Sequence, residues 1–232
     1  MQRCLIVVAV AAEARAIISA LGTPESVRLG PYSAERIRTS QSEISVVAGG
    51  IGPAAAASAT ATALMAEPAF DTVISAGIGG GFEAAGAKIG DVVVATKICF
   101  ADLGAHSPEK FLDAAALGWT GASFACSAAA AKELGRRIAF RGLRVHLGTI
   151  VTVAAATGTA ARAADLTLAH NAVAEGMEGA GVAHAAILFG KPVLEFRAVS
   201  NAVGERNVAA WDIPRALKVL ELAAESLREF SA

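Results

Sequence analysis

Short apolar runs, rich in β-branched residues, recur along this chain, and helix-prone segments separate several of them. Such alternation indicates an α/β fold whose central sheet is largely parallel. Six runs have this character: residues 5–10, 44–47, 72–75, 92–96, 145–153 and 193–200.

Two of the intervening segments carry clear helix signals. Pro53 opens an alanine-rich run that continues to Ala66, and proline is favoured at the first position of a helix. Near the end of the chain, apolar residues recur at spacings of three and four after Asp212, which predicts an amphipathic helix with this aspartate as its N-cap. Residues 103–123 are rich in glycine and serine and are expected to form one long loop, a kind of segment that is often functional.

The composition favours a well-packed chain and a small-molecule partner. Hydrophobic residues make up 54% of the 232 residues and charged residues only 18%, which excludes disorder as the main state. Twenty basic and 21 acidic residues leave a net charge of -1, so the charge balance gives no sign of binding to nucleic acid or to an anionic membrane. The length suits one domain spanning residues 1–232.

The cysteines and the first residues bear on the cellular compartment. The three cysteines are far apart, which suggests neither a disulfide framework nor a metal or redox pair and fits a reducing cytoplasm. Arg3, a short apolar run and several alanines give the start a superficial likeness to a secretion signal. We interpret it as the first strand, because it leads directly into a helix-prone segment. No later apolar run reaches the roughly 18 to 20 residues that a membrane span needs.

Two glycine-rich turns follow predicted strands. Residues 50–55 match the G-x-G-x-x-A spacing of a dinucleotide-binding turn, but the next strand ends in Ala76-Gly77 and lacks the acidic residue that would hold a ribose. Residues 77–81 form the second cluster. Glycines let backbone N–H groups approach a ligand closely, but they also form plain turns, and each cluster alone is more often structural.

Two glutamates are candidates for a site, although each also has an ordinary explanation. Glu13 follows the first predicted strand, at the end where open α/β sheets bind ligands, but a surface glutamate would also stabilise the first turn of a helix. Glu178 lies among small residues next to Met177, where its two oxygens could accept hydrogen bonds from two ribose hydroxyls. A buried glutamate held by backbone amides explains that segment equally well.

The stretch LEFRAVSN, residues 194–201, places charged residues in a strand that otherwise reads as buried. Glu195 and Arg197 are two residues apart and therefore share a strand face. Charged residues are almost never fully buried unless they are paired, and pairing of these two would relieve the cost. A purely structural ion pair and a part of a site both remain open for this stretch alone.

Five motifs, taken in order and covering nearly the whole chain, resemble the purine nucleoside phosphorylase and nucleosidase superfamily: GGIGPAAAA, SAGIGGGF, GDVVVATK, EGMEGAGVAHAA and FRAVSN. The methylthioadenosine/adenosylhomocysteine nucleosidases have a Met-Glu pair and an Arg-x-x-Ser-Asp strand end, which Met177-Glu178 and residues 197–201 resemble. The resemblance implies a three-layer nucleoside phosphorylase-like fold, with a central, largely parallel mixed sheet flanked by helices.

The resemblance also implies roles for individual residues. Glu13, oriented by Arg197, would activate a water molecule, while Glu178, next to Met177, would grip the ribose hydroxyls. Asn201 would hold the departing base. Backbone groups would line the water side at Gly79 and Gly80 and flank the purine at Ala156 and Thr157. Ala156 departs from the aromatic residue often found there, so stacking on the purine would come from elsewhere or be weaker.

Asn201 is the main departure from the adenine-specific nucleosidases, which have an aspartate that protonates the purine at N7. Asparagine cannot act as an acid, but its amide offers a donor and an acceptor, which suits the N7 and O6 edge of a 6-oxopurine such as hypoxanthine. A 6-oxopurine anion is also a better leaving group than an adenine anion, so hydrogen bonds to the developing charge can suffice. The substitution points to inosine-type substrates.

The region after the first strand separates hydrolysis from phosphorolysis. The phosphorylases place a basic, phosphate-accepting loop there, whereas this chain has Ala11-Ala12-Glu13, as the nucleosidases do. A carboxylate would repel phosphate but can take a proton from water. We therefore expect hydrolysis. The alternatives are a methylthioadenosine/adenosylhomocysteine nucleosidase, a phosphate-dependent purine nucleoside phosphorylase, and a nucleoside-binding protein that has lost catalysis.

Within the superfamily, residues 101–109 and the continuation after Asn201, with Trp211-Asp212 beyond it, resemble the futalosine hydrolase subgroup. This subgroup releases hypoxanthine from futalosine and leaves dehypoxanthine futalosine, in menaquinone biosynthesis. Arg206 is our candidate for the carboxylate on the 5' side of such a substrate, because a guanidinium binds carboxylates bidentately, although a solvated loop arginine is the ordinary explanation. The resemblance implies a purine nucleoside as partner, no metal or cofactor, no nucleic acid or membrane, and a homo-oligomer, a dimer or larger.

Overall fold

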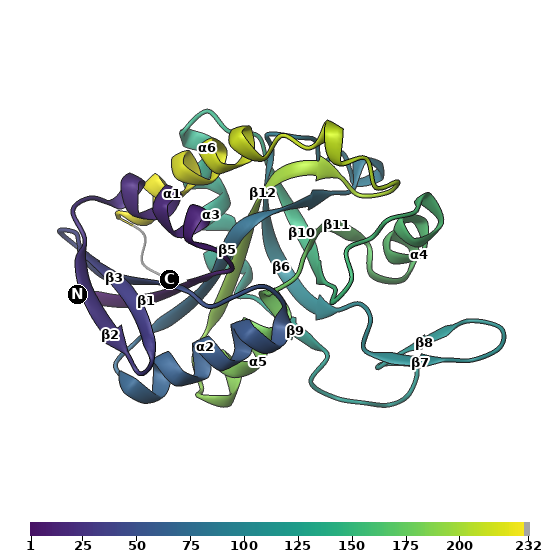
Figure 1. Ribbon diagram of the computed structural model, residues 1–232, viewed down its shortest axis with the longest axis horizontal. Coiled ribbons are helices and arrows are strands. Elements are labelled where there is room, and N and C mark those ends of the chain that lie inside the picture. Colours follow the sequence, from purple (N-terminus) through teal and green to yellow (C-terminus); the bar gives the residue numbers. More distant parts are fainter. Residues whose placement is uncertain (230–232) are drawn as a thin grey trace.

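A twisted mixed sheet lies between two sets of helices in the computed structural model, which describes residues 1–229 (Figure 1). This arrangement confirms the three-layer α/β fold that the sequence predicts. One face of the sheet carries α1 (Ala11–Leu21), α3 (Ala128–Phe140) and α6 (Ile213–Ala224), and the other carries α2 (Pro53–Ala66) and α5 (Gly179–Leu188). The remaining helix, α4 (Ala160–His170), packs beside the strand at one end of the sheet.

The main sheet has ten strands, nine of which follow the order β11-β10-β6-β12-β5-β1-β4-β3-β2, while β9 pairs with β6. Parallel pairs join β4, β1, β5 and β12 in succession and also join β6, β10 and β11, whereas β12 and β6 run antiparallel. The strand bounds are β1 Gln2–Val8, β2 Glu25–Leu29, β3 Tyr32–Arg38, β4 Ser42–Ala48, β5 Thr72–Gly81, β6 Val92–Phe100, β9 Ser123–Ala125, β10 Val145–Thr152, β11 Ala172–Gly176 and β12 Val193–Ala202.

The glycine-rich end of β5 closes five of these strands into a ring. β5 pairs with β12 along its length and also, at Gly80 and Gly81, with β11, so that β5, β12, β6, β10 and β11 form a closed circuit. Close contact requires glycine here, because a Cβ at Gly79 would lie 2.5 Å from the carbonyl oxygen of Glu175. Closure gathers the ends of β5, β11 and β12 in one place.

The core runs through the middle of the sheet and under both helical layers. The C-terminal half of β1, residues 5–8, is completely buried, and most of β5 and β12 is buried as well. Strands covered on both faces read as continuous apolar runs, which is why these segments stand out in the sequence. The polar exceptions in β12 are therefore informative about the site.

The predicted elements agree with the structure in most places. Helix α2 begins and ends at the predicted residues, and Asp212 caps α6, since its Oδ1 accepts the backbone N–H of Arg215 at 3.1 Å. The first strand ends at Val8 rather than at residue 10, and β5 continues well beyond the predicted run, to Gly81. The sequence did not identify β2, β3 or β11, which are short or carry polar residues at alternate positions.

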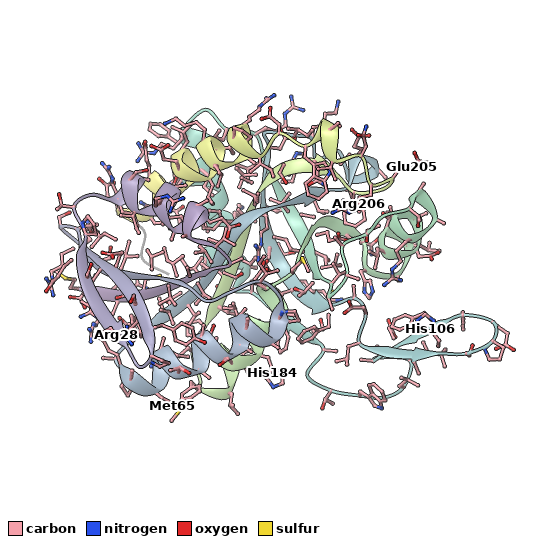
Figure 2. All side chains as sticks on the ribbon, in the orientation of Figure 1. Arg28, Met65, His106, His184, Glu205 and Arg206 are labelled. Carbon is pink, nitrogen blue, oxygen red and sulfur yellow. The ribbon has the colours of Figure 1, made fainter. Side chains whose placement is uncertain are left out.

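The expectation of one continuous loop over residues 103–123 is wrong in part. The segment contains a small hairpin of β7 (Gly104–His106) and β8 (Phe111–Asp113), and β9 begins at its end. Each hairpin strand has only three residues, too few to give a recognisable alternation. The hairpin projects from the body of the molecule in Figure 1, and Figure 2 shows His106 on it.

Candidate active site

A cavity of about 290 Å³ lies at the C-terminal ends of β1, β5 and β12, between the starts of α1 and α5. Open α/β sheets bind their ligands at this end of the strands. All the predicted site residues line it except Arg197 and Arg206. Those that do are Glu13, Gly79, Gly80, Ala156, Thr157, Met177, Glu178 and Asn201.

Glu13 is the third residue of α1 and is only 3% exposed. Its Oε2 accepts the backbone N–H groups of Ala9 at 3.0 Å and Val10 at 3.1 Å, and its Oε1 accepts that of Ile78 at 2.9 Å. The ordinary explanation therefore applies in part, because the carboxylate caps the start of its own helix. Burial raises the pKa of Glu13, and this outweighs the lowering by Arg197. A carboxylate with a raised pKa in a cavity is suited to accept a proton.

Arg197 lies beneath the cavity in β12 and is 1% exposed. Its Nε donates to Glu195 at 2.8 Å, which confirms the predicted pairing, and its Nη1 donates to Glu178 at 3.0 Å. Nη2 donates to the hydroxyl of Ser75 at 3.0 Å. Every nitrogen of the guanidinium thus has a fixed acceptor, so the group holds the surrounding carboxylates in place.

Gly77 is the point at which Glu13 and Arg197 meet. A Cβ added at this glycine would lie 2.5 Å from Oε1 of Glu13 and 2.7 Å from Nη1 of Arg197. Any side chain would therefore push the two charged groups apart. The second glycine cluster of the sequence is therefore part of β5 and not the turn that the sequence suggested, and its first glycine makes room for the charged residues.

Glu178 occupies the N-cap position of α5 and is 4% exposed. Its Oε1 accepts the backbone N–H of Gly52 at 3.2 Å, and its Oε2 accepts that of Met177 at 3.3 Å in addition to Arg197. Backbone amides therefore satisfy this glutamate, as one of the two explanations expects, and it also lines the cavity.

A break in the register of β12 aims Asn201 at the cavity. Val199 pairs with Gly79 and Asn201 pairs with Gly80, so that Ser200 forms a bulge between them. Bulges of this kind re-aim side chains and are frequent next to active sites. The Ser200 hydroxyl donates a hydrogen bond to Oδ1 of Asn201 at 2.8 Å, while Nδ2 of Asn201 donates to the carbonyl of Ala202 at 3.1 Å. The amide is thereby held in one orientation.

Sequence reasoning missed Glu175, which lies in β11, lines the cavity and is 7% exposed. Its Oε1 accepts the backbone N–H of Thr157 at 2.9 Å, and its Oε2 accepts the Thr157 hydroxyl. Burial raises the pKa of Glu175, and the hydrogen bonds from Thr157 only partly offset this. One signal in the sequence could have pointed to Glu175, because it stands three residues before Glu178 of the Met-Glu motif. The apolar pattern did not reveal the strand in which it lies.

Trp211 adds an aromatic side chain to the cavity wall, where Ala156 provides none. The guanidinium carbon of Arg206 lies 5.3 Å from the centre of the Trp211 ring, a distance typical of a cation–π contact. Arg206 itself is exposed and stands outside the cavity lining, in the loop between β12 and α6 that Figure 2 labels. Its backbone N–H donates to the carbonyl of Gly158 at 3.3 Å, which ties the two loops together.

Two features are absent from residues 1–229, the part of the chain that the structure describes. No cluster of three or more His, Cys, Asp or Glu side chains in this part of the chain is arranged to hold a metal ion. None of the helices described there combines the length and apolar character needed to cross a membrane.

The profile of the phosphorylase superfamily matches residues 3–231. The chain belongs to this superfamily. A futalosine hydrolase of Streptomyces coelicolor is 47% identical over 192 residues, which span 78% of this chain and 77% of that protein. One of Acidothermus cellulolyticus is 44% identical over 224 residues, which span 96% of this chain and 89% of that protein.

Two solved structures share the fold at low sequence identity. The 5'-methylthioadenosine/S-adenosylhomocysteine nucleosidase of Neisseria meningitidis in complex with methylthio-immucillin-A superposes with a TM-score of 0.82 at 23% identity, covering 99% of this chain and 100% of that one. The native futalosine hydrolase of Helicobacter pylori strain 26695 gives 0.80 at 21% identity, covering 97% and 95%. The nucleoside phosphorylase-like fold predicted from the motifs is therefore confirmed.

Proposed function

We propose that this chain is a futalosine hydrolase, an N-glycosyl hydrolase that uses water to cleave futalosine into hypoxanthine and dehypoxanthine futalosine. The observation that carries the proposal is a single cavity in which a buried carboxylate, Glu13, and a strand-end amide, Asn201, both face the space for a ligand. The relatives named futalosine hydrolase, at 44% and 47% identity, support it.

The charge of the cavity supports hydrolysis rather than phosphorolysis. Among the described residues that line it, three are glutamates (Glu13, Glu175 and Glu178), and none is a lysine or an arginine. Arg197 lies below them and already pairs with Glu178 and Glu195. A phosphate ion would therefore meet negative charge without a free cation, whereas a neutral water molecule would find proton acceptors.

The reaction then follows from the positions of these groups. Glu178 accepts hydrogen bonds from the ribose hydroxyls. As the bond between C1' and the purine nitrogen breaks, its electron pair goes to the base, and the nearby carboxylates stabilise the positive charge on the sugar. Water bonds to C1' and gives a proton to Glu13, while the base takes a proton from solvent. Asn201 cannot supply this proton, but its amide stabilises the charge that develops on a 6-oxopurine.

The rest of the substrate is assigned to the neighbouring loops. Trp211 supplies a ring that can stack on an aromatic group, and Arg206 beside it binds the carboxylate of the 5' substituent, from just outside the cavity lining. Replacement of Arg206 by alanine should then raise KM for futalosine by about 10-fold and leave KM for inosine, which has no carboxylate, unchanged. An equal change for both nucleosides would remove Arg206 from this role.

The protein is further proposed to be a cytoplasmic homo-oligomer, a dimer or larger. The projecting β7–β8 hairpin supports this, because such an arm can reach a second copy (Figure 1). Light scattering after size-exclusion chromatography would measure the mass in solution. A mass equal to the 23.3 kDa of one chain would contradict the proposal.

The decisive assay supplies futalosine, inosine and methylthioadenosine to the purified protein, with and without phosphate, and identifies the free base by chromatography. We expect hypoxanthine from futalosine at a rate that phosphate does not change. A requirement for phosphate would identify a phosphorylase, and preferential release of adenine would identify a methylthioadenosine nucleosidase.

The variant Asn201→Asp should shift preference toward adenine nucleosides, because an aspartic acid can protonate the base, and an unchanged preference would refute the role of Asn201.

A further inference from the structure

Glu175 and Asn201 stand on either side of one glycine. Gly80 pairs with Glu175 of β11 on one edge and with Asn201 of β12 on the other. Residues that pair across neighbouring strands point to the same face of a sheet, and both side chains line the same cavity. The ring closure of the sheet therefore places a carboxylate and an amide at opposite ends of a short floor.

The size of this floor matches a flat nucleobase. Glu175 and Asn201 lie on either side of β5, so their backbones are two strand spacings apart, which is about 10 Å. The two side chains extend into part of this distance, and the rest has room for a flat ring. Gly80 between them has no side chain, and a Cβ there would lie 2.6 Å from Val203 and 3.2 Å from Nδ2 of Asn201. A side chain at this position would therefore displace Val203 and press on the amide of Asn201.

The carboxylate of Glu175 has fewer partners than the other two glutamates that line the cavity. Glu13 and Glu178 each accept backbone N–H groups from two or more residues, and Arg197 lies close to both. Both hydrogen bonds to Glu175 come from Thr157, and no lysine or arginine of the described residues forms an ion pair with it. Two carboxylate oxygens can accept about four hydrogen bonds, so this one has capacity for a donor from the cavity.

We propose that Glu175 accepts the N1–H of a 6-oxopurine and, together with Asn201, selects hypoxanthine against adenine. The inference rests on the proposed function, since it assigns the base of the same substrate. Hypoxanthine carries a hydrogen on N1, whereas adenine has a lone pair there. A carboxylate only accepts, so adenine would place two acceptors against each other in a buried site, a mismatch that discriminates strongly.

A rival role for Glu175 is purely structural, because it also holds the loop at Thr157. The two roles predict different results. If the glutamate only fixes the loop, then loss of its contact with the Thr157 hydroxyl would have the same effect as a change of the glutamate itself, and neither would alter the choice of base. If it contacts the base, only the change at Glu175 alters that choice.

The test compares Glu175→Gln with Thr157→Val and with Glu221→Gln, a matched carboxylate-to-amide change on the exposed side of α6. We measure kcat/KM for inosine and adenosine. Glu175→Gln should lower the value for inosine roughly 10- to 100-fold and leave or raise that for adenosine, because the glutamine amide can donate to N1 of adenine. Thr157→Val should lower both alike, and Glu221→Gln should change neither. An unchanged ratio of inosine to adenosine in Glu175→Gln would overturn the inference.

Binding measurements test the contact between Glu175 and the base even if the proposed hydrolysis of futalosine is wrong. If the unmodified protein releases no hypoxanthine from futalosine, the proposed function fails, but calorimetry with free hypoxanthine and adenine still tests Glu175. If Glu175→Gln does not fold, the unmodified protein suffices. We expect 1-methylhypoxanthine, in which a methyl group replaces the N1 hydrogen, to bind more than about 10-fold more weakly than hypoxanthine. Equal affinities for the two bases would refute the contact.

Discussion

The molecule contains two clusters of arginines and glutamates that differ in balance and burial. The edge cluster, on β1 to β4 and the end of α2, joins as many arginines as glutamates, and its side chains are 13% to 60% exposed. The site cluster surrounds one arginine with three glutamates, and all four are almost completely buried. The edge cluster consists of Arg3, Arg36, Arg38, Glu25, Glu43 and Glu67, and the site cluster of Arg197, Glu13, Glu178 and Glu195.

The difference shows which cluster folding alone would favour. Balanced pairs near the surface contribute little to stability but carry little penalty. In the site cluster, three carboxylates share one cation, and Oε2 of Glu195 has no hydrogen-bond partner among the described residues. Burial raises the pKa values of Glu13 and Glu195, so ionisation of these groups opposes folding. Such an arrangement is retained where chemistry requires it, and here it lies under the cavity.

The largest expected effect is on turnover, from the variant Glu13→Gln. A glutamine cannot accept the proton of water, so kcat should fall by about 10²- to 10⁴-fold while futalosine still binds. The amide nitrogen must also face an N–H group of Ala9, Val10 or Ile78, which should lower the free energy of unfolding by about 1–3 kcal/mol. Steady-state kinetics, futalosine titration and chemical denaturation measure the three effects.

The matched control for Glu13→Gln is Glu43→Gln in the edge cluster. This change also turns a carboxylate that binds arginines into an amide, but it lies far from the cavity lining, so turnover should stay unchanged. Turnover of Glu13→Gln at the level of the unmodified protein would exclude Glu13 as the base.

The second prediction compares the two clusters by stability. Arg197→Met leaves three buried carboxylates without a cation and should lower the free energy of unfolding by about 3–5 kcal/mol at neutral pH. Arg36→Met should change it by about 1 kcal/mol or less, because Glu43 and Glu67 keep Arg3 as a partner. Urea denaturation of both variants measures the difference. If both variants lost the same free energy of unfolding, the difference in burial and charge balance between the two clusters would have no effect on stability.

The sequence predicted the residues whose chemistry is carried by local motifs. The pairing of Glu195 with Arg197 follows from a spacing of two in a strand, and α2 follows from its proline and alanines. The positions of Glu13, Glu178 and Asn201 in one cavity agree with the motif resemblance. Glu13 and Asn201 also lie at or near the ends of strands that the sequence predicts.

The remaining site residues depend on contacts that no local pattern encodes. Glu175 reaches the cavity because the glycine-rich end of β5 pairs with β11, which is a contact between segments almost a hundred residues apart. β11 itself has five residues and no alternation. Trp211 lies in the loop between β12 and α6, in contact with Arg206 of the same loop, and the backbone N–H of Arg206 donates to the distant residue Gly158.

The smallest expected effects concern pH, and they have opposite signs in the two clusters. Glu13 must be ionised to accept a proton, and burial raises its pKa, partly offset by Arg197 and reinforced by Glu178. The value of kcat/KM should therefore fall, as pH decreases, at a higher pH than the ordinary pKa of a glutamate. Glu43 differs, because Arg38, Arg3 and Arg36 lower its pKa more than burial raises it.

A lowered pKa in the folded state means that Glu43 adds stability above its unfolded pKa and that this stability is lost as pH falls through its folded pKa. Glu43→Gln should consequently be less stable than the unmodified protein at neutral pH, with the difference vanishing in acid, while its pH profile of kcat/KM keeps the acid limb of the unmodified protein. Denaturation and kinetics across the acid range measure both. An acid limb that moves in Glu43→Gln would mean that the edge cluster influences Glu13, and the two clusters would no longer be independent.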